Sequence, residues 1–588
     1  MRLEQFGGSF LEDELRKTLL KHVLANAVKY GGKADAKAVM GKVFSEMPEL
    51  KQRAREILEA VTKIVEEVNA MPIDDQRKMF EEVFPKVPEK RKVEERKELP
   101  PLPNVEKYGK VVMRLAPYPS GPLHIGNARM AILNDEYVKR YGGELLLVFD
   151  DTIGGGEKRV VPEAYDLIIE GLQWLGVKWR KEFYKSDRVP IFYDYCEDLI
   201  KKGYAYVCTC EREEWRERFK EKMKACPHRD SPFEENLEKW EGMLEGAYGE
   251  GEAVVRLKTG MDQPDPALRD HVIMRISERE HPRVGSKYRV WPLLEFSWAI
   301  DDRLLGVTHI LRGKDLVKED AIERFVWKIY GWPEVEFIHY GILTFKGLKL
   351  SKTEARKNIE KGVYMGWSDP RTWSLQSLQR RGIKPEALRD SILSLGLSLI
   401  DVEYSPESLY AVNRRLIDPE ANRYFFVERP VKLIVEGVPF ERLVSRPPLH
   451  PDFPERGTRT IEVNVKNEHA EVYVEERDVM RMSEGDIFRL KDLLNFEVKG
   501  KSEGGVVGEF HSLSVDEVRA RRAPIIHWVP REGCLKVKVV KPDGDVVEGL
   551  GEPDCRKLTR DMLVQFERYG FCRVDSVKPE ILLFFSHD

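Results

Sequence analysis

The sequence predicts a multidomain protein in which a helical N-terminal region precedes a parallel α/β domain and an all-β C-terminal region. Its 588 residues exceed what one hydrophobic core supports, and roughly 150 residues per domain suggests about four domains. Strand-like apolar runs alternate with helical patterns from about residue 105 onward. After about residue 424 the pattern changes to short alternating runs such as TIEVNVKNEHAEVYVEE, which indicate β-barrels.

Residues 1–85 are predicted to form a helical region. LRKTLLKHVLANAVKY carries apolar residues at helical spacing and stops at Gly31-Gly32, and REILEAVTKIVEEVNAM repeats this pattern up to Pro72. The segment 86–104 combines many charged residues with four prolines. Because such a composition cannot bury a core, we predict a linker there.

A strand, a turn and a helix are predicted in succession between residues 111 and 142, as VVMRLAP, YPSGPLHIG and NARMAILNDEYVKRYG. This order places His124 and Gly126 where a helix begins, and helix N-termini favour phosphate. Gly126 would let a ligand approach the backbone, and His124 could donate a hydrogen bond to a phosphate oxygen. The alternative is a glycine-containing turn with an incidental histidine.

A second candidate motif is FKGLKLSKTEARK, which places Lys349 and Lys352 around Ser351 in a glycine-containing loop. Two lysines three residues apart are commonly a solvated face. Together, however, PLHIGNAR and FKGLKLSKTEARK resemble the HIGH and KMSKS signatures of class I aminoacyl-tRNA synthetases, with Asn127 and Leu350 as mild departures. The resemblance implies a Rossmann-type domain whose two motifs bind ATP from opposite sides, with Mg²⁺ accompanying the ATP. It implies two catalytic residues, His124 and Lys352, and an ATP-binding set of His124, Gly126, Asn127, Lys349, Ser351 and Lys352.

Further motifs resemble the glutamyl- and glutaminyl-tRNA synthetases, and most of all the archaeal-type glutamyl enzymes: RLAPYPSGPLHIG, FDDT, YDLIIEGLQWLGVKW, HILRGKD, NRRLIDPEANRYFFV and IIHWVP. The match runs from about residue 100 to the C-terminus. It implies activation of glutamate as an adenylate, followed by transfer to the 3′ end of tRNA(Glu). The implied domains are a catalytic domain at 105–345 with an acceptor-stem insert at about 200–290, a lysine-loop and helical stem-contact region at 346–423, and anticodon-binding barrels at 424–588.

Three residues of these motifs are implied to bind the amino acid. Arg114 and Arg312 match family arginines that would face the side chain of the substrate, and Asp150 matches the acid that holds its α-ammonium group. Arg312 favours glutamate over glutamine, because a buried carboxylate needs a cationic partner. Each residue could instead form an ordinary ion pair, and a glutaminyl enzyme remains the alternative.

Two departures from the family pattern keep a third interpretation open. Leu294 stands where the family commonly has a tyrosine that contacts the substrate, and residues Ile153 to Gly156 replace the usual Asp-Pro after DDT. These changes would suit a tRNA-binding paralogue with weak catalysis. The catalytic candidates that remain argue against that interpretation.

The segment VCTCEREEWRERFKEKMKACPHRD offers four candidate zinc ligands: Cys208, Cys210, Cys226 and His228. Three thiolates and one imidazole complete a tetrahedral structural site. The alternative is that these cysteines are small buried hydrophobes. The other four cysteines, Cys196, Cys534, Cys555 and Cys572, show no ligand spacing and are interpreted as ordinary.

Composition adds weaker expectations about location and partners. The net charge of −4 does not indicate a nucleic-acid-binding protein, but it does not exclude a local basic face. Arg380, Arg381 and Lys384 are candidates for phosphate contacts; the alternative is that they form a solvated helical cap. No apolar stretch is long enough to cross a membrane and no signal peptide is evident, so we expect a cytoplasmic monomer. The resemblance implies tRNA(Glu) and glutamate as partners. It leaves open tRNA(Gln), whose charging would imply a downstream amidotransferase.

Overall fold

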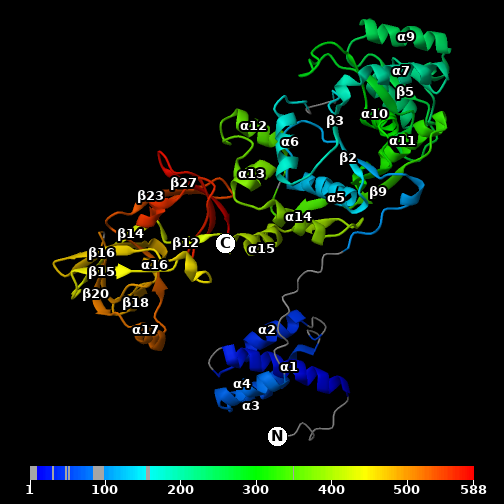
Figure 1. Ribbon diagram of the computed structural model, residues 1–588. Helices are drawn as coiled ribbons and strands as arrows, with labels where there is room; N and C mark the ends of the chain where they lie inside the picture. The colour runs from blue at the N-terminus through cyan, green and yellow to red at the C-terminus, as the bar shows by residue number, and fades with distance from the viewer. Residues whose placement is uncertain are drawn as a thin grey trace. The chain divides into compact units, whose positions relative to one another are not determined.

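The computed structural model describes residues 10–29, 32–46, 50, 53–83, 98–153, 159–348, 350–502 and 504–588 (Figure 1). The chain divides into two compact units, Met1–Glu95 and Arg96–Asp588, and each is described by itself. Lys349, Gly154–Gly156 and most of the predicted linker lie outside the described residues.

The first unit is helical, as the periodicity predicts. Its helices are α1 (Phe10–Lys29), α2 (Ala36–Glu46), α3 (Ala54–Asn69) and α4 (Ile73–Val83). Val23, Val39, Val61 and Val68 are fully buried between them. The buried Gln76 amide donates hydrogen bonds to the carbonyls of Gly32, Val68 and Met71, so it satisfies backbone groups where two helices end.

The second unit contains the predicted parallel α/β sheet. Strand β1 (Val112–Leu115) pairs with β2 (Glu144–Phe149), which pairs with β3 (Lys181–Tyr184), and β8 (His309–Gly313) pairs with β9 (Glu336–Tyr340), all in parallel. Thr308 joins the two groups, because its amide donates to the Val112 carbonyl at 2.9 Å. The resulting order β3-β2-β1-β8-β9 is that of a doubly wound sheet, in which ligands bind at the carboxyl ends of the strands.

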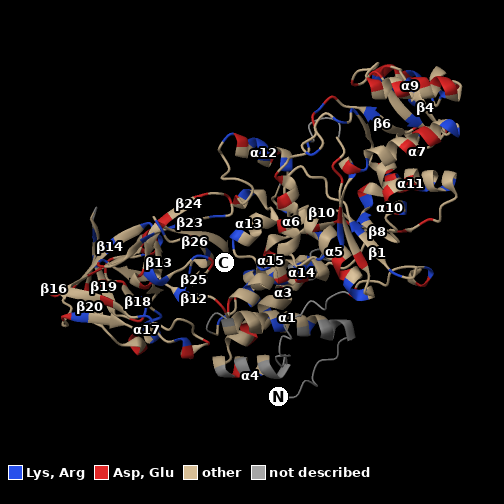
Figure 2. Cartoon of the chain, turned by 45° about the horizontal axis from the view of Figure 1, so that its top comes forward, with Lys and Arg blue, Asp and Glu red and all other residues tan. Residues whose placement is uncertain are grey.

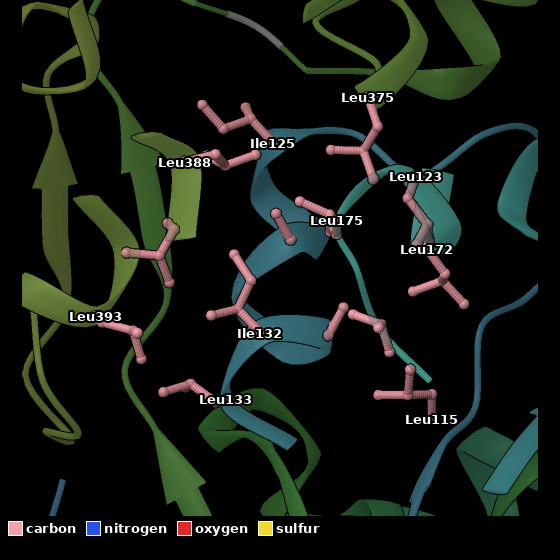
Figure 3. Packing of buried hydrophobic residues seen from close by; sticks show 14 of the residues in the cluster. Leu115, Leu123, Ile125, Ile132, Leu133, Leu172, Leu175, Leu375, Leu388 and Leu393 are labelled. Carbon is pink, nitrogen blue, oxygen red and sulfur yellow. The ribbon is translucent and has the colours of Figure 1, made fainter. Parts of the chain in front are cut away.

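Helices connect these strands, and their apolar faces form one core with the segments that follow the sheet. Leu123 and Ile125 lie at the start of α5 (Ile125–Tyr141) and pack with Leu375 of α13 (Leu375–Arg380) and Leu388 of α14 (Pro385–Ser394) (Figure 3). All four are at most 1% exposed. The beginning of α5 is therefore held from both sides by apolar packing.

An antiparallel subdomain interrupts the parallel sheet. Strands β4 (Ala205–Cys208), β5 (Val254–Leu257), β6 (Val272–Ile276) and β7 (Val290–Pro292) pair in that order. Along the chain, this subdomain follows α6 (Ala164–Trp174) and α7 (Val189–Lys201) and precedes α10 (Leu294–Leu304) and α11 (Val317–Tyr330). Helix α9 (Phe233–Glu245) lies between β4 and β5 in the sequence.

The region after the sheet was predicted as helical, and it contains one short strand as well. Helices α12 (Lys352–Glu360), α13, α14 and α15 (Pro406–Ile417) agree with the prediction. Between α14 and α15, β11 (Val402–Tyr404) pairs in parallel with β10 (Leu343–Phe345). Three residues carry too little periodicity to predict a strand that depends on a partner about 60 positions earlier.

The C-terminal sheets are barrel-like. The seven-stranded sheet has the order β12-β25-β26-β27-β23-β24-β13, and its two outermost strands β12 (Asn422–Tyr424) and β13 (Phe426–Glu428) are separated by one residue, which brings its edges together. Its other strands are β23 (Leu535–Val540), β24 (Val546–Gly551), β25 (Leu563–Phe566), β26 (Gly570–Ser576) and β27 (Ile581–His587). The second sheet contains β14 (Pro430–Glu436), β15 (Arg442–Ser445), β16 (Ile461–Lys466), β17 (His469–Glu475), β18 (Ile487–Leu490), β19 (Asn495–Ser502), β20 (Gly505–Ser512), β21 (Ile525–Ile526) and β22 (Trp528–Pro530).

The prediction that Arg381 contacts phosphate is wrong. Arg381 is fully buried, and its guanidinium donates to the carbonyls of Phe585 at 3.1 Å and Ser586 at 2.6 Å. Arg380 pairs with Asp575, and Lys384 lies 2.8 Å from Glu420. These cations therefore bind later segments of the same chain. The carboxylates and carbonyls that they contact lie up to 205 residues further on.

Basic and acidic residues are intermixed along the ribbon of the second unit (Figure 2). Many pair with one another at the surface, as Lys201 does with Glu197 and Lys239 with Glu235. Among the residues that the structure describes, no helix is both long and apolar enough to cross a membrane.

Candidate active site

His124 is the N-cap of α5, directly beyond the carboxyl end of β1. Its Nδ1 accepts a hydrogen bond from the Gly126 amide at 3.1 Å, so the proton of the neutral ring resides on Nε2. The Asn127 side chain accepts from the His124 amide at 3.3 Å and completes a capping box. Burial, together with the nearby charge of Lys352, lowers the pKa of His124 to about 3. The imidazole is therefore a neutral donor with its Nε2–H available.

Gly126 is required by the histidine ring itself. A Cβ at this position would lie 2.9 Å from His124 Cε1 and 3.0 Å from Nδ1. The sequence predicted this glycine for the approach of a ligand. The structure adds that any side chain would displace the imidazole from its cap.

The lysine motif lies against the histidine motif. Ser351 is the N-cap of α12, where its hydroxyl accepts from the Glu354 amide, and Lys352 is the first residue of that helix. Lys352 Nζ donates to the Gly121 carbonyl at 3.4 Å. A cleft between the motifs is lined by Pro122, His124, Ser351, Lys352, Ala355, Trp367, Thr372 and Ser374. Two segments more than 200 residues apart thus line one cleft, while Lys349 lies outside the described residues.

The segment before α13 holds the histidine motif in place, a contact that the sequence did not reveal. The Ile125 amide donates to the Trp373 carbonyl at 3.0 Å, and the Leu375 amide donates to the Leu123 carbonyl at 2.9 Å. Ser374 also forms a bridge with His124. The turn that presents His124 is therefore fixed by backbone hydrogen bonds on both sides.

Two of the three predicted amino-acid-binding residues, Arg114 and Arg312, meet at Trp298 of α10, and Asp150 lies near Arg114. The guanidinium carbon of Arg114 lies 4.6 Å from the centroid of the indole, and that of Arg312 lies 5.0 Å from it. The carboxylate of Asp150 lies at the end of β2, close enough to Arg114 for the two charges to interact. The cluster lies at the carboxyl ends of the parallel strands, where the fold places a ligand.

Both arginines already have carboxylate partners within the protein. Arg114 donates to Asp302 through Nε at 2.5 Å and Nη2 at 2.8 Å. Arg312 donates to Asp320 and, through Nη1, to Glu323 at 2.7 Å. Burial raises the pKa of Glu323, which is fully buried, and the charge of Arg312 opposes this rise. A substrate carboxylate would share these guanidinium groups, each of which has five donors.

Lys185 is a site residue that sequence reasoning missed. Its ammonium group is fully buried, lies 3.0 Å from Asp150 Oδ1, and donates to Ser297 Oγ at 2.5 Å. It also lies 5.2 Å from the Trp298 ring centroid, so three cations converge on one indole. It directly follows β3, and residues at that edge of a parallel sheet face the ligand.

The two departures from the family pattern lie at this cluster. Leu294 is the first residue of α10, and its carbonyl accepts from the Ser297 hydroxyl at 2.9 Å. Ile153 is buried, and its carbonyl accepts from Arg275 at 2.8 Å. The residues that follow Ile153, up to Gly156, lie outside the described residues.

The predicted zinc ligands form one cluster on the antiparallel subdomain. One ligand atom of each of Cys208, Cys210, Cys226 and His228 lies within 4.8 Å of all the others. Cys208 Sγ is 3.9 Å from Cys226 Sγ, and Cys210 Sγ is 3.4 Å from His228 Nδ1. Tetrahedral zinc with Zn–S distances of about 2.3 Å separates two sulfur atoms by about 3.8 Å, so the donor set and spacing fit this metal.

A second contact fixes the orientation of the histidine in this cluster. His228 Nε2 lies 3.0 Å from the Thr209 hydroxyl oxygen, which can accept a hydrogen bond from Nε2–H. The lone pair of Nδ1 then faces the thiols. Cys208 and Cys226 are buried, whereas Cys210 and His228 are partly exposed. With four protein ligands the site would be closed, which is the pattern of a structural metal.

Comparison with known proteins agrees with this geometry. Residues 110–419 match the catalytic domain of class I tRNA synthetases (E and Q). Residues 421–515 and 525–575 match two anti-codon binding domains of the same class. The first match contains the cleft, the amino-acid cluster and the cysteine cluster.

Curated relatives are similar over nearly the whole chain. The Glutamate--tRNA ligase of Thermococcus kodakarensis is 46% identical over 98% of this chain and 100% of that protein. The one from Methanopyrus kandleri is 44% identical over the same shares. A solved glutamate tRNA ligase from Elizabethkingia meningosepticum is 22% identical, with a TM-score of 0.39, and covers 53% of this chain and 70% of that chain. The family matches and the full-length relatives carry the assignment: the chain belongs to the class I glutamyl- and glutaminyl-tRNA synthetases and groups with the archaeal glutamate–tRNA ligases.

Proposed function

We propose that this chain activates glutamate with ATP and transfers it to the 3′ end of tRNA(Glu), as its curated relatives' name, Glutamate--tRNA ligase, describes. The observation that carries the proposal is the combination of two sites on one sheet. The cleft between His124 and Lys352 suits phosphates, and the cation cluster around Trp298 suits an acidic amino acid.

Adenylate formation requires the α-carboxylate of glutamate to attack the α-phosphorus of ATP and release pyrophosphate. His124 would donate its Nε2–H to a phosphate oxygen, and Lys352 would neutralise charge that develops on the phosphates. His124 and Lys352 would thus position the phosphates and stabilise the charge that develops on them. Mg²⁺ bound with the ATP would supply further charge neutralisation.

The acidic and the basic residues of the cluster would bind different groups of glutamate. Asp150 would receive the α-ammonium group, while Arg114 and Arg312 would share their remaining N–H donors with the γ-carboxylate. A neutral amide gains less from two guanidinium groups than a carboxylate does. A glutaminyl enzyme is therefore not favoured, in agreement with the relatives.

The remaining parts would bind tRNA. In this assignment the subdomain at about 200–290 contacts the acceptor stem with a structural zinc at Cys208, Cys210, Cys226 and His228, the region 346–423 carries the lysine loop and contacts the stem, and the double barrel at 424–588 reads the anticodon. Base recognition by such barrels relies on unpaired bases. We assign no role to the helical region 1–85.

The proposal also covers location and acceptor range. We place the enzyme in the cytoplasm as a monomer. Two acceptor ranges are compatible with this function: tRNA(Glu) alone, or tRNA(Glu) and tRNA(Gln) together. The second requires an amidotransferase that converts the glutamyl product on tRNA(Gln), and charging of each purified tRNA with glutamate separates the two ranges.

Replacement of Lys352 tests the catalytic assignment. We expect Lys352→Ala to reduce kcat for charging of tRNA(Glu) with glutamate by about 10²-fold, because an oriented cation on the phosphates is lost. Lys361→Ala is the matched control, since Lys361 is exposed at the other end of α12. Equal kcat in the Lys352 variant and the wild type would remove this lysine from the mechanism.

A further inference from the structure

Lys185 is a charged group in the amino-acid cluster that neither the motifs nor the comparisons assign. It follows β3, its side chain is fully buried, and its Nζ lies between Asp150 Oδ1 at 3.0 Å and Ser297 Oγ at 2.5 Å. An unpaired buried ammonium group would be costly, so this lysine is held by its ion pair. The pair lies in the part of the sheet where the substrate is expected.

The turns that carry the two charges are fixed to each other. Asp151, next to Asp150, accepts from the Ser186 amide at 2.9 Å and the Ser186 hydroxyl at 2.7 Å. It also accepts from the Tyr165 hydroxyl at 2.9 Å, and it is fully buried. Because Ser186 follows Lys185, this contact sets the distance between the ammonium group and the Asp150 carboxylate.

The carboxylate of Asp150 has capacity for one more donor. Among the residues that the structure describes, no donor is aligned on Oδ1 as a hydrogen bond, although Lys185 lies at ion-pair distance. An ionised carboxylate accepts several hydrogen bonds, so a second cation can bind there without displacing the first. Leu294 offers no polar side chain to this region, and the Lys185–Ser297 pair is joined to its carbonyl.

We propose that Lys185 is a positioning residue of the amino-acid pocket, which keeps Asp150 ionised and oriented to bind the α-ammonium group of glutamate. This inference rests on the proposed function, which assigns the ammonium group to Asp150. Burial raises the pKa of Asp150, and Lys185 opposes that rise. Without the lysine the carboxylate would be protonated at a higher pH and would lose its attraction for the substrate.

The other charged groups near the pair do not replace this lysine. Arg114 on β1 is engaged with Asp302, and Asp151 disfavours a second negative charge beside it. On α10, Glu295 and Asp301 are anionic groups that face Lys185 and would not stabilise a carboxylate. Lys185 is therefore the cation whose removal should act on Asp150 most strongly.

The test is steady-state charging of tRNA(Glu) by the full-length enzyme, with glutamate varied at saturating ATP over a range of pH. We expect Lys185→Met to raise KM for glutamate about tenfold or more and to shift the acid limb of kcat/KM for glutamate upward by at least about one pH unit. KM for ATP should stay within about twofold. Lys181→Met is the matched control, because Lys181 is an exposed lysine at the other end of β3, and it should change neither quantity.

Three further variants keep the inference falsifiable. Lys185→Arg retains the charge and should leave the acid limb near its wild-type position, and Ser297→Ala should shift the limb in the same direction as Lys185→Met, by less. Equal rises in both KM values with an unmoved acid limb would show that Lys185 is merely structural and would overturn the inference. If Asp150→Asn leaves the glutamate kinetics unchanged, the assignment of Asp150 fails instead.

Discussion

His124 illustrates how a single residue serves structure and chemistry at once. Its Nδ1 caps α5 through the Gly126 amide, which leaves Nε2–H as the group that can contact phosphate. The depressed pKa keeps the ring neutral, so its donor state does not change across the physiological range. A protonated ring would lose the cap, since Nδ1 could no longer accept.

We expect kcat/KM for ATP to show no inflection near pH 6.5, because the pKa of His124 is lowered to about 3 and the neutral ring persists down to that pH. His124→Gln should lower kcat/KM by about 10²-fold without changing the shape of the pH profile between pH 5 and 9. The measurement is charging of tRNA(Glu) at varied ATP. An inflection near pH 6.5 that disappears in the variant would contradict the assigned protonation state.

The sequence indicated the candidate substrate-binding residues better than the residues that hold them. Arg114, Asp150 and Arg312 lie close together, because each lies near the carboxyl end of a strand of the same sheet or directly after one. Asp302, the partner of Arg114, could not be predicted, since an ion pair across 188 residues leaves no local pattern. Arg381 was wrongly predicted to bind phosphate because its burial depends on the distant strand β27.

At the scale of elements, the cysteine cluster joins the end of β4 to the turn that precedes α9. Cys208 ends the strand and Cys226 starts the turn that leads to His228, so four ligands come from one short segment. Paired ligands at close spacing are a local signal, which is why the sequence predicted this cluster completely. By contrast, β11 was missed because three residues depend on pairing with β10.

We expect about one zinc per purified chain, and Cys226→Ser should abolish zinc binding and lower the thermal midpoint of the second unit by several degrees. Metal analysis and calorimetry measure the two effects. Cys534→Ser is the control, because Cys534 is partly exposed and lies in another domain. Retention of a full equivalent of zinc by the Cys226 variant would exclude that cysteine as a ligand.

At the scale of the whole molecule, α13 connects the catalytic region to the C-terminal sheet. Its N-terminal flank binds the histidine motif through Trp373 and Leu375, and Arg381 beyond its C-terminus binds the carbonyls of β27. Arg381 also lies over the Trp373 ring, with 5.0 Å between the guanidinium carbon and the ring centroid. The cleft beside His124 and the anticodon-binding region are therefore joined by a short, buried set of contacts.

We expect Arg381→Met to lower the free energy of unfolding by about 2–4 kcal/mol, because two buried carbonyls and the Tyr410 hydroxyl lose their donor. Urea unfolding monitored by tryptophan fluorescence measures the change. Arg380→Met is the neighbouring control, and its partly exposed pair with Asp575 should contribute about 1 kcal/mol or less. Equal destabilisation by the two substitutions would contradict the assigned difference between the buried and the surface arginine.

The most direct test of the central claim is to charge purified tRNA(Glu) with glutamate and, separately, with glutamine, using the full-length enzyme and ATP. The cation cluster around Trp298 predicts ATP-dependent transfer of glutamate, with kcat/KM for glutamine lower by about 10²-fold or more. Transfer of glutamine as efficient as that of glutamate would contradict the account of Arg114 and Arg312. Absence of charging with either amino acid, while tRNA still binds, would contradict the catalytic assignment of the cleft.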